Sequence, residues 1–427
     1  MGTDSAQTRS GAERSVPTLR LLEGRVVTAA WGAPELLEPY GDVHAGGDDR
    51  PAAEVWFGAH PRNPSTVVDA DGRRPATELA PGEVPDLLLK LLAAGGPLSI
   101  QVHPDDATAR RGFAREEADG VPLDATERCF VDPSGKPELV RAVTPMRVLC
   151  GLRSAASSRR LLSLLAPTGI DALVEVLGHG DTALAEAIAH VLRADAVSVA
   201  VMLAAVADGA HEVVRRAEQE GPDGAGPAAD LLRLARLALD LQARFPGDAG
   251  TLVALLLEDA DLAPGETIFV APGTPHAYLH GLGVEVMASS DNVLRGGMTE
   301  KAVDVEAFLG LLDTTAVGVP RVGRLPRRSD GTGWHRTIIP SDAFLVDEAR
   351  VEVRLVVERS GTGVGLLLCL DGRVAVVASD GSAVALGPGG AALISPGSGD
   401  VVVEGSGTVV HAAPGASRAA SDAQPAG

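Results

Sequence analysis

The sequence predicts a mainly β fold in which a helical domain is inserted into the first of two jelly-roll β domains. Three observations predict this class. Short β-like runs separated by Gly- and Pro-containing turns occupy residues 16–152 and 250–320. Apolar residues at i, i+3 and i+4 spacing fill residues 153–249 between them. Short Val-, Leu- and Ala-rich runs with regular turns then occupy residues 321–414.

The composition agrees with this class. A length of 427 residues fits two or three domains of ~150 residues each. Hydrophobic residues make up 45% of the chain but aromatic residues only 3%, so the core must consist of Ala, Val and Leu. The 50 glycines and 29 prolines favour many short strands and turns over a long helical bundle.

The first β domain begins after a polar stretch, residues 1–15, which we expect to be a loose tail. Its β-like runs are Arg25–Thr28, Glu54–Phe57 and Leu98–His103. The Leu-rich stretch Asp86–Ala93 between them is predicted to be a helix.

In the inserted domain, the apolar spacing predicts helices over Ile170–Leu177, Ala183–Leu192 and Ala229–Ala243. The longest apolar run of this region, Ala196–Ala207, has about 12 residues, which is too short to span a bilayer. We therefore expect a buried helix there and no membrane association.

Strand-like sequence resumes at Thr267–Val270, and Val303–Leu312 is predicted to be helical. In the second β domain, the predicted turns are Leu370–Gly372, Ser379–Gly381 and Pro388–Gly390. The polar, Ala-rich residues 415–427 are predicted to form a second loose tail.

Charge and cysteine content restrict the partners and the compartment. The net charge of -20 repels phosphate backbones and argues against nucleic-acid binding. It also repels a small phosphorylated ligand, so any such site requires a local basic pocket. Three cysteines without a CxxC pair indicate free thiols in a reducing compartment. The N-terminal residues lack the apolar segment of a signal peptide, so we expect a cytoplasmic protein.

Three short segments carry candidate metal ligands. Gln101 and His103 lie two residues apart and share a face if they belong to one strand. Glu138 follows Pro137, and His276 follows a Pro/Gly-rich turn. Each segment alone is ordinary strand or turn sequence. Together, two imidazoles, one carboxylate and one amide oxygen suit Zn²⁺ as a Lewis acid.

A fourth segment is polar and leads from an apolar strand to a basic residue. Ser289–Asn292 precedes Arg295, and such loops beside rigid strands are typical functional sites. The alternative is that Arg295 only forms a structural salt bridge. His280 would lie about 13 Å from His276 along a strand and is not predicted to be a ligand. His60 and Trp56 are expected to organise the barrel wall.

These segments closely resemble the type I phosphomannose isomerase family. The resemblance rests on Gln-x-His-Pro at Gln101, Lys-Pro-Glu at Lys136 and a long pattern from Pro275 to Lys301. It also includes Ala-Trp-Gly at Ala30 and Trp-Phe-Gly-Ala-His-Pro at Trp56. It covers residues 18–152 and 250–312 strongly, whereas the remainder matches only in layout.

The resemblance implies two cupin-type β domains and an isomerase that interconverts mannose 6-phosphate and fructose 6-phosphate with one Zn²⁺ per chain. It implies zinc ligation by Gln101, His103, Glu138 and His276, and an active-site role for Arg295. It further implies that Ser99, Lys90 and Lys301 hold the phosphate. The family often has a basic residue where this chain has Asp106, so that residue's role does not carry over.

Such a reaction moves a proton between C1 and C2 through a cis-enediol, with Arg295 orienting the sugar. The sequence leaves the base open between Glu285 and Lys136. Two alternative functions are an iron-dependent cupin dioxygenase and a non-catalytic sugar-binding cupin. The only partner expected is the phosphosugar substrate, with no nucleic acid or membrane, and the chain is expected to be a monomer.

Overall fold

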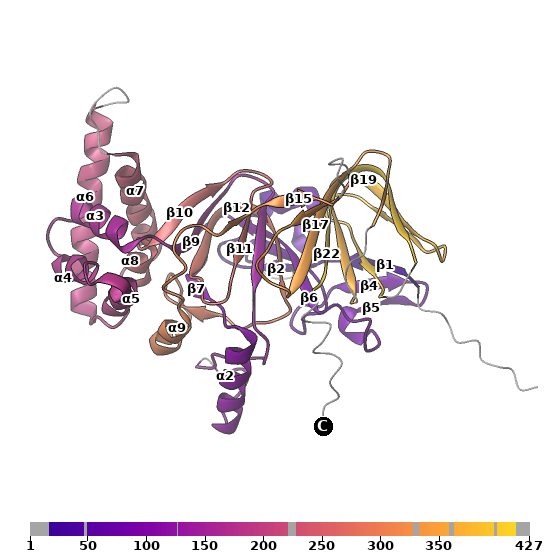
Figure 1. Cartoon of the computed structure of the whole chain (residues 1–427), viewed down its shortest axis with the longest axis horizontal. Helices are drawn as coiled ribbons and strands as arrows, with labels where there is room; N and C mark the ends of the chain where they lie inside the picture. The colour runs from indigo at the N-terminus through magenta and orange to yellow at the C-terminus, as the bar shows by residue number, and fades with distance from the viewer. Residues whose placement is uncertain are drawn as a thin grey trace, which may run out of the picture.

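A computed structural model describes residues 17–46, 49–125, 127–220, 228–327, 333–357, 363–396 and 399–415. The tail predicted at 1–15 lies outside the described residues, as does the one predicted at 415–427 apart from Gly415. Figure 1 shows three regions in a row: helices at one end, a central set of strands, and a second β region at the other end.

The central region is an antiparallel sheet system that contains the predicted metal ligands. Its strands are β2 (Arg25–Thr28), β3 (Ala52–Phe57), β6 (Leu87–Ala94), β7 (Gln101–Val102), β8 (Glu138–Ala142), β9 (Met146–Leu152), β10 (Leu257–Leu262), β11 (Thr267–Val270), β12 (His276–Ala288), β13 (Leu294–Arg295) and β14 (Arg321–Val322). The main path runs β14-β11-β8-β12-β6-β3-β2. The long strand β12 also pairs with β7 and β9, so it joins both walls of the barrel.

The second sheet combines strands from both ends of the described chain. Its strands are β1 (Leu19–Glu23), β4 (Thr66–Asp69), β5 (Gly72–Pro75), β15 (Arg324–Pro326), β16 (His335–Thr337), β17 (Phe344–Val351), β18 (Arg354–Val356), β19 (Gly365–Ala378), β20 (Ala383–Leu386), β21 (Ala391–Ile394) and β22 (Val401–Pro414). Leu19 of β1 pairs with Ile394 of β21. The sequence boundary at residue 320 did not anticipate this pairing of β1, β4 and β5 with the C-terminal strands.

The two sheets share one apolar interface. Leu89 and Leu91 of β6 pack in the same buried cluster as Val410 of β22 and Leu393 of β21. Burial of such side chains is the main stabilising contribution in a fold of this kind. The second β region therefore covers one face of the central sheet and leaves the barrel interior for other groups.

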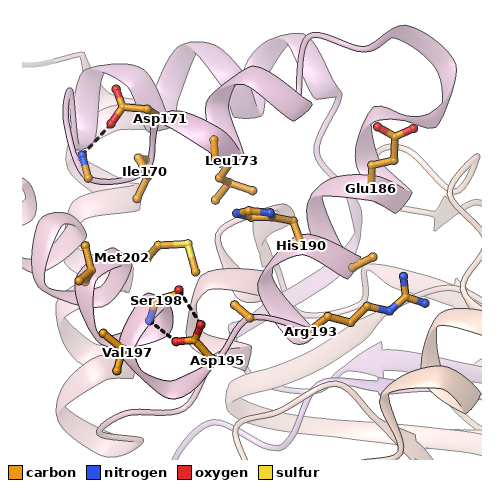
Figure 2. A pocket seen from close by; sticks show the side chains of 15 residues that line it. Ile170, Asp171, Leu173, Glu186, His190, Arg193, Asp195, Val197, Ser198 and Met202 are labelled. Carbon is orange, nitrogen blue, oxygen red and sulfur yellow. Dashed lines mark hydrogen bonds between the residues drawn. The ribbon is translucent and has the colours of Figure 1, made fainter.

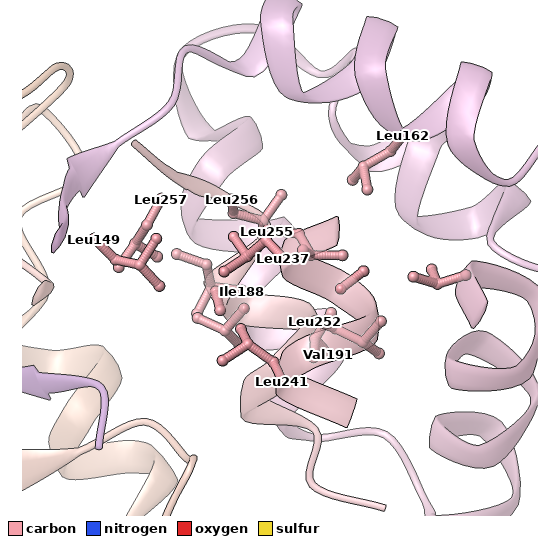
Figure 3. Close-up of a cluster of buried hydrophobic side chains, with 14 of the residues drawn as sticks. Leu149, Leu162, Ile188, Val191, Leu237, Leu241, Leu252, Leu255, Leu256 and Leu257 are labelled. Atoms are coloured by element: carbon pink, nitrogen blue, oxygen red, sulfur yellow. The ribbon is translucent and has the colours of Figure 1, made fainter. Parts of the chain in front are cut away.

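Helices α3 (Ala155–Leu165), α4 (Asp171–Val176), α5 (Ala183–Leu192), α6 (Ala196–Glu220), α7 (Ala229–Arg244) and α8 (Gly250–Ala254) lie between β9 and β10. The predicted helices of this region are confirmed. Their core, shown in Figure 3, packs Ile188 of α5 and Leu241 of α7 near Leu149 of β9. Elsewhere lie α1 (Pro34–Leu37), α2 (Asp106–Ala118) and α9 (Val305–Leu311), with short turns η1 (Glu38–Tyr40), η2 (Val43–Gly46), η3 (Ala76–Glu78) and η4 (Gly180–Thr182).

Helix α6 is longer than the predicted Ala196–Ala207. By length and composition alone, its stretch Ala196–Gln219 could cross a membrane. A helix in a protein core can meet the same two criteria. Val199, Met202 and Val206 recur at helical spacing and belong to the buried core of the helical region. The helix packs against α7, as a core helix does.

The helix predicted at Asp86–Ala93 is wrong, because this stretch forms strand β6. All eight residues of β6 are buried. Leu89 and Leu91 face the second sheet, whereas Leu92 and Lys90 lie on the opposite face. A strand covered on both faces loses its apolar/polar alternation, so its composition resembles a buried helix.

Two smaller expectations also change. The predicted turn Leu370–Gly372 is a register shift within β19, where Gly372 adopts a φ of 77°. A Cβ at this glycine would approach the Ser406 carbonyl oxygen within 2.1 Å, so only glycine fits there. Of the strand predicted at Leu98–His103, only Gln101–Val102 is regular strand.

Candidate metal centre and substrate cleft

Three of the predicted ligands meet inside the central barrel. His103 follows β7, Glu138 begins β8 and His276 begins β12. Their ligand atoms all lie within 4.8 Å of one another, and all three residues are buried. The imidazole centroids of His103 and His276 are 5.0 Å apart. The fold thus gathers two nitrogen donors and one carboxylate from three different strands.

Backbone carbonyls orient both imidazoles toward the carboxylate. His103 Nδ1 lies 2.9 Å from the Asn292 oxygen, and His276 Nδ1 lies 3.1 Å from the Thr274 oxygen. Because a carbonyl oxygen only accepts, each Nδ1 carries the proton and each Nε2 presents a lone pair. The two Nε2 atoms lie 3.3 Å and 3.4 Å from the two oxygens of Glu138.

The protonation states suit a metal. Burial lowers the pKa of His103 to about 4, so this imidazole is neutral near pH 7. Burial alone would raise the pKa of Glu138, but its interactions with His103 and Lys136 outweigh it and hold the pKa well below its usual range. Two imidazoles and one carboxylate with oriented donor atoms fit Zn²⁺.

Gln101 lies beside this group. It is directly opposite His276 in the β12–β7 register and opposite Arg295 in the β13–β7 register. Its side-chain nitrogen donates to Ser99 Oγ at 3.3 Å. That bond orients the amide and leaves its oxygen available as a fourth donor. Cross-strand partners share a face, so Gln101, His276 and Arg295 form one row.

Lys136 lies directly against the ligand group. Its Nζ is 2.5 Å from Glu138 Oε1 and 3.4 Å from His103 Nε2. The lysine therefore pairs with the carboxylate that we expect to hold the metal, and its ammonium neutralises that carboxylate in the barrel interior.

A second buried charge network lies on the neighbouring strands. Lys90 Nζ is 3.0 Å from Glu285 Oε2 and 3.5 Å from Glu54 Oε1, and it stacks 4.7 Å above the Trp56 ring. Burial would lower the pKa of Lys90, but the carboxylates of Glu285 and Glu54 outweigh it and raise that pKa. Burial raises the pKa of Glu285 despite the nearby lysine. This network places a basic carboxylate beside the metal group. The nearby buried Tyr278 hydroxyl has no hydrogen-bond partner among the described residues.

Arg295 and Lys301 line one cleft of about 1110 Å³, outside the metal group. Among the described residues, the Arg295 guanidinium makes one hydrogen bond, a long one of 3.5 Å to the Val293 carbonyl. Burial lowers the pKa of Arg295, and burial followed by the charge of Arg295 lowers the pKa of Lys301. Among the described residues, neither cation has a carboxylate within ion-pairing distance. Glu127, Glu300, Asp304 and Glu306 also line the cleft, so an anion would be bound locally, at Arg295 and Lys301.

The polar segment Ser289–Asn292 holds the neighbouring loop in place through hydrogen bonds to Asp132. The Asn292 amide and the Asp291 backbone N–H both donate to Asp132, at 2.8 Å and 2.9 Å. Ser290 Oγ also donates to the Asp132 carboxylate. These bonds fix the loop that precedes Lys136 and the carbonyl that orients His103. Sequence reasoning missed Asp132, because a lone aspartate before a Pro-Ser-Gly turn resembles an ordinary turn residue.

His60 contacts this segment rather than the metal group. Its Nε2 lies 3.2 Å from Asp291 Oδ2, and its ring packs edge-on against Trp56 at 5.0 Å between centroids. His280 is exposed on β12.

A separate cavity of about 780 Å³ lies in the helical region (Figure 2). Ile170, Leu173 and Met202 form apolar walls, and the His190 ring points into it. Asp171 and Asp195 accept bonds from nearby backbone N–H groups. The cavity holds none of the metal-ligating groups found in the described residues.

Known proteins are similar to this chain in sequence over most of its length. The family model for the type I phosphomannose isomerase catalytic domain matches residues 21–155. Mannose-6-phosphate isomerase of Salmonella typhimurium is 35% identical over 317 residues, covering 67% of this chain and 73% of that protein. The human enzyme of the same name is 29% identical over 309 residues, covering 66% of this chain and 68% of that protein.

Solved structures extend the similarity to nearly the whole chain. A Salmonella typhimurium mannose 6-phosphate isomerase structure with bound fructose 6-phosphate and zinc has a TM-score of 0.78 and 27% identity. It covers 93% of this chain and 100% of that chain. A zinc-bound mannose 6-phosphate isomerase has a TM-score of 0.79 with the same identity and coverage. The second β region and the helical region, which the sequence pattern matched only in layout, fall within this coverage.

Proposed function

This chain belongs to the type I phosphomannose isomerase family, and we propose that it is a zinc-dependent enzyme that interconverts D-mannose 6-phosphate and D-fructose 6-phosphate. One observation carries the proposal: the buried His103–Glu138–His276 group lies beside a cleft with unneutralised cations. The group suits zinc and the cations suit a phosphate. The relatives give no support to a dioxygenase or a non-catalytic sugar-binding cupin.

We propose that Gln101, His103, Glu138 and His276 hold one Zn²⁺ per chain. When bound, the ion supplies Lewis-acid stabilisation of negative charge on the sugar oxygens. Asn292 and Thr274 support the site, because their carbonyls fix the two imidazole tautomers.

Of the two candidate bases, we propose Glu285. Lys136 Nζ lies 2.5 Å from Glu138 Oε1, so it is already engaged by the carboxylate that we expect to hold the metal. Glu285 is a carboxylate whose pKa is raised by burial, which makes it a better proton acceptor. Lys90 holds its Oε2 and leaves Oε1 to move the proton between C1 and C2 of a cis-enediol.

We propose that Arg295 and Lys301 bind the phosphate and orient the ring-opened sugar. Phosphate contact by Ser99 and Lys90 stays a prediction, but their surroundings favour other roles. Lys90 is buried between Glu285 and Glu54, so its charge is already neutralised. Ser99 accepts the bond that orients Gln101.

We also propose the domain division at residues 16–152 with 250–320, 153–249 and 321–414, in which β1, β4 and β5 of the first part complete the second sheet. We further propose a monomeric, cytoplasmic enzyme. The three cysteines are free thiols, as expected in a reducing compartment. Light scattering on the purified chain tests the monomer, because a dimer would double the measured mass.

A coupled assay with mannose 6-phosphate, together with metal analysis, tests the activity. We expect stoichiometric zinc, formation of fructose 6-phosphate, loss of turnover on chelation and recovery with added Zn²⁺. Oxygen uptake should be absent. Turnover that survives complete removal of the metal would contradict the proposal.

A further inference from the structure

A third cation, outside the four segments discussed so far, lies close enough to Lys301 to interact with its charge. Arg62 lies in the loop after β3, and its side chain is 63% exposed. Its Nε is 3.0 Å from Asp291 Oδ2, the same oxygen that His60 Nε2 approaches at 3.2 Å. Asp291 lies four residues before Arg295, so this ion pair ties the Arg62 loop to the segment that leads into the cleft residues Val293–Arg295.

The charges around Asp291 do not balance. The positive charges of Arg295 and Arg62 both lower the pKa of Lys301, after the larger effect of burial, whereas Asp291 raises it. Arg62, Arg295 and Lys301 therefore surround one carboxylate. Neither Arg295 nor Lys301 has an ion-pairing carboxylate of its own among the described residues. Two cations without ion-pair partners in a chain of net charge -20 favour the binding of an anion beside them, although carboxylates line other parts of the cleft.

We propose that Arg62 is a specificity-determining residue that binds the substrate phosphate, with Asp291 as its resting counter-ion. The inference rests on the proposed isomerase function, because the anion is then the sugar phosphate. In the free enzyme, Asp291 holds the guanidinium at the cleft. On binding, the phosphate dianion replaces this carboxylate as the partner of Arg62.

The exchange is physically favourable. An ion pair with a mostly exposed arginine is weak, so it opens readily. A phosphate dianion carries more charge than a carboxylate and accepts two parallel bonds from a guanidinium. Asp291 keeps its contact with His60, so its carboxylate is not left unpaired when Arg62 turns away.

A phosphate-binding role for Arg62 affects the binding of the substrate and not the proton transfer. Arg62 contacts the phosphate end of the substrate and not the carbons that exchange a proton. Its removal should weaken ground-state and transition-state binding equally, which raises KM and leaves kcat unchanged. Inorganic phosphate should lose affinity in parallel, because it occupies the same subsite.

The test compares Arg62→Ala with Arg73→Ala. Arg73 is a matched control, because it is 61% exposed and pairs with a single carboxylate, Glu23, in the second sheet. For Arg62→Ala we expect about a tenfold rise in both the KM for mannose 6-phosphate and the inhibition constant of inorganic phosphate, with kcat within about twofold. Arg73→Ala should leave all three values unchanged.

A second variant tests the counter-ion. Asp291→Asn removes the competing charge, so inorganic phosphate should bind several times more tightly; unchanged or weaker binding contradicts the counter-ion role. The inference is overturned if Arg62→Ala matches Arg73→Ala, or if it lowers kcat with KM and phosphate affinity unchanged. An inactive but zinc-loaded wild-type chain would instead refute the proposed function, and calorimetry with inorganic phosphate would still compare the two arginines.

Discussion

The two β regions both bury charged side chains, but they differ in whether the cations have a carboxylate partner within the chain. In the second sheet, Arg336 bonds both oxygens of the buried Asp347, and Arg327 lies 3.3 Å from one of them. In the central barrel, Arg295 and Lys301 lack such a carboxylate among the described residues. A charge neutralised within the chain stabilises structure, whereas a charge left for an external partner indicates a binding site.

The imidazoles extend this contrast. His411 of β22 lies opposite Asp347 of β17 and packs near Trp334 inside the second sheet. In the central barrel, His103 and His276 instead turn their Nε2 atoms toward one shared carboxylate. Three donor atoms that face a common point can hold a metal ion. A single histidine such as His411, opposite an aspartate that arginines already hold, offers no such group.

The largest expected effect comes from Glu138→Gln. The amide keeps the shape but removes the only carboxylate of the ligand group, so zinc should be lost and kcat/KM should fall by at least about a thousandfold. Metal analysis and the coupled assay measure both quantities. A variant that retained zinc and turnover would show that Glu138 is not a ligand.

Glu285→Gln should reduce turnover nearly as much without releasing the metal. Burial raises the pKa of Glu285 above its ordinary value of 4.5, so the wild type should lose kcat as the pH falls through that raised pKa. The base must be deprotonated, which fixes the direction of this change. The variant should lack this limb of the pH profile.

The raised pKa of Glu285 also makes the stability of the fold depend on pH. A folded-state pKa above the unfolded value means that the native state binds the proton more tightly. Ionisation of Glu285 therefore lowers the free energy of unfolding as the pH rises through the window above 4.5. Denaturant titrations of wild type and Glu285→Gln across this window measure the difference. In the pH profile of kcat, a loss of activity at low pH that persists in Glu285→Gln would show that another group is the base.

Arg295→Ala should come next, with a loss of about a hundredfold or more in kcat/KM and normal zinc content. Its guanidinium has one long contact to a carbonyl, so its removal breaks no ion pair among the described residues. The thermal midpoint should therefore hardly change. Near-normal activity would refute the role proposed for Arg295.

Donor chemistry and the resemblance to family motifs, rather than local periodicity, pointed to the ligand residues. The structure brings His103, Glu138 and His276 together, whereas ligation by Gln101 stays a prediction. The sequence could not predict contacts between distant segments, such as Asp132 with Asn292 or Arg62 with Asp291, because no local periodicity encodes them. The strand β6 was misassigned because burial on both faces removes the alternation that identifies a strand.

The last prediction concerns the neutralised pair of the second sheet. Asp347→Asn leaves Arg336 and Arg327 beside an uncharged amide in a site where Asp347 is buried, so the free energy of unfolding should fall by about 3 kcal/mol. Denaturant unfolding measures this loss.

In the same variant, kcat, KM and zinc content should remain at wild-type values, because Asp347 lies in the sheet that covers the barrel rather than in the barrel. The matched comparison is Glu138→Gln, which removes one buried carboxylate of the other region and should abolish activity. If Asp347→Asn lost activity without losing stability, the distinction between neutralised and available charge would fail, since a paired carboxylate far from the cleft would then act in catalysis.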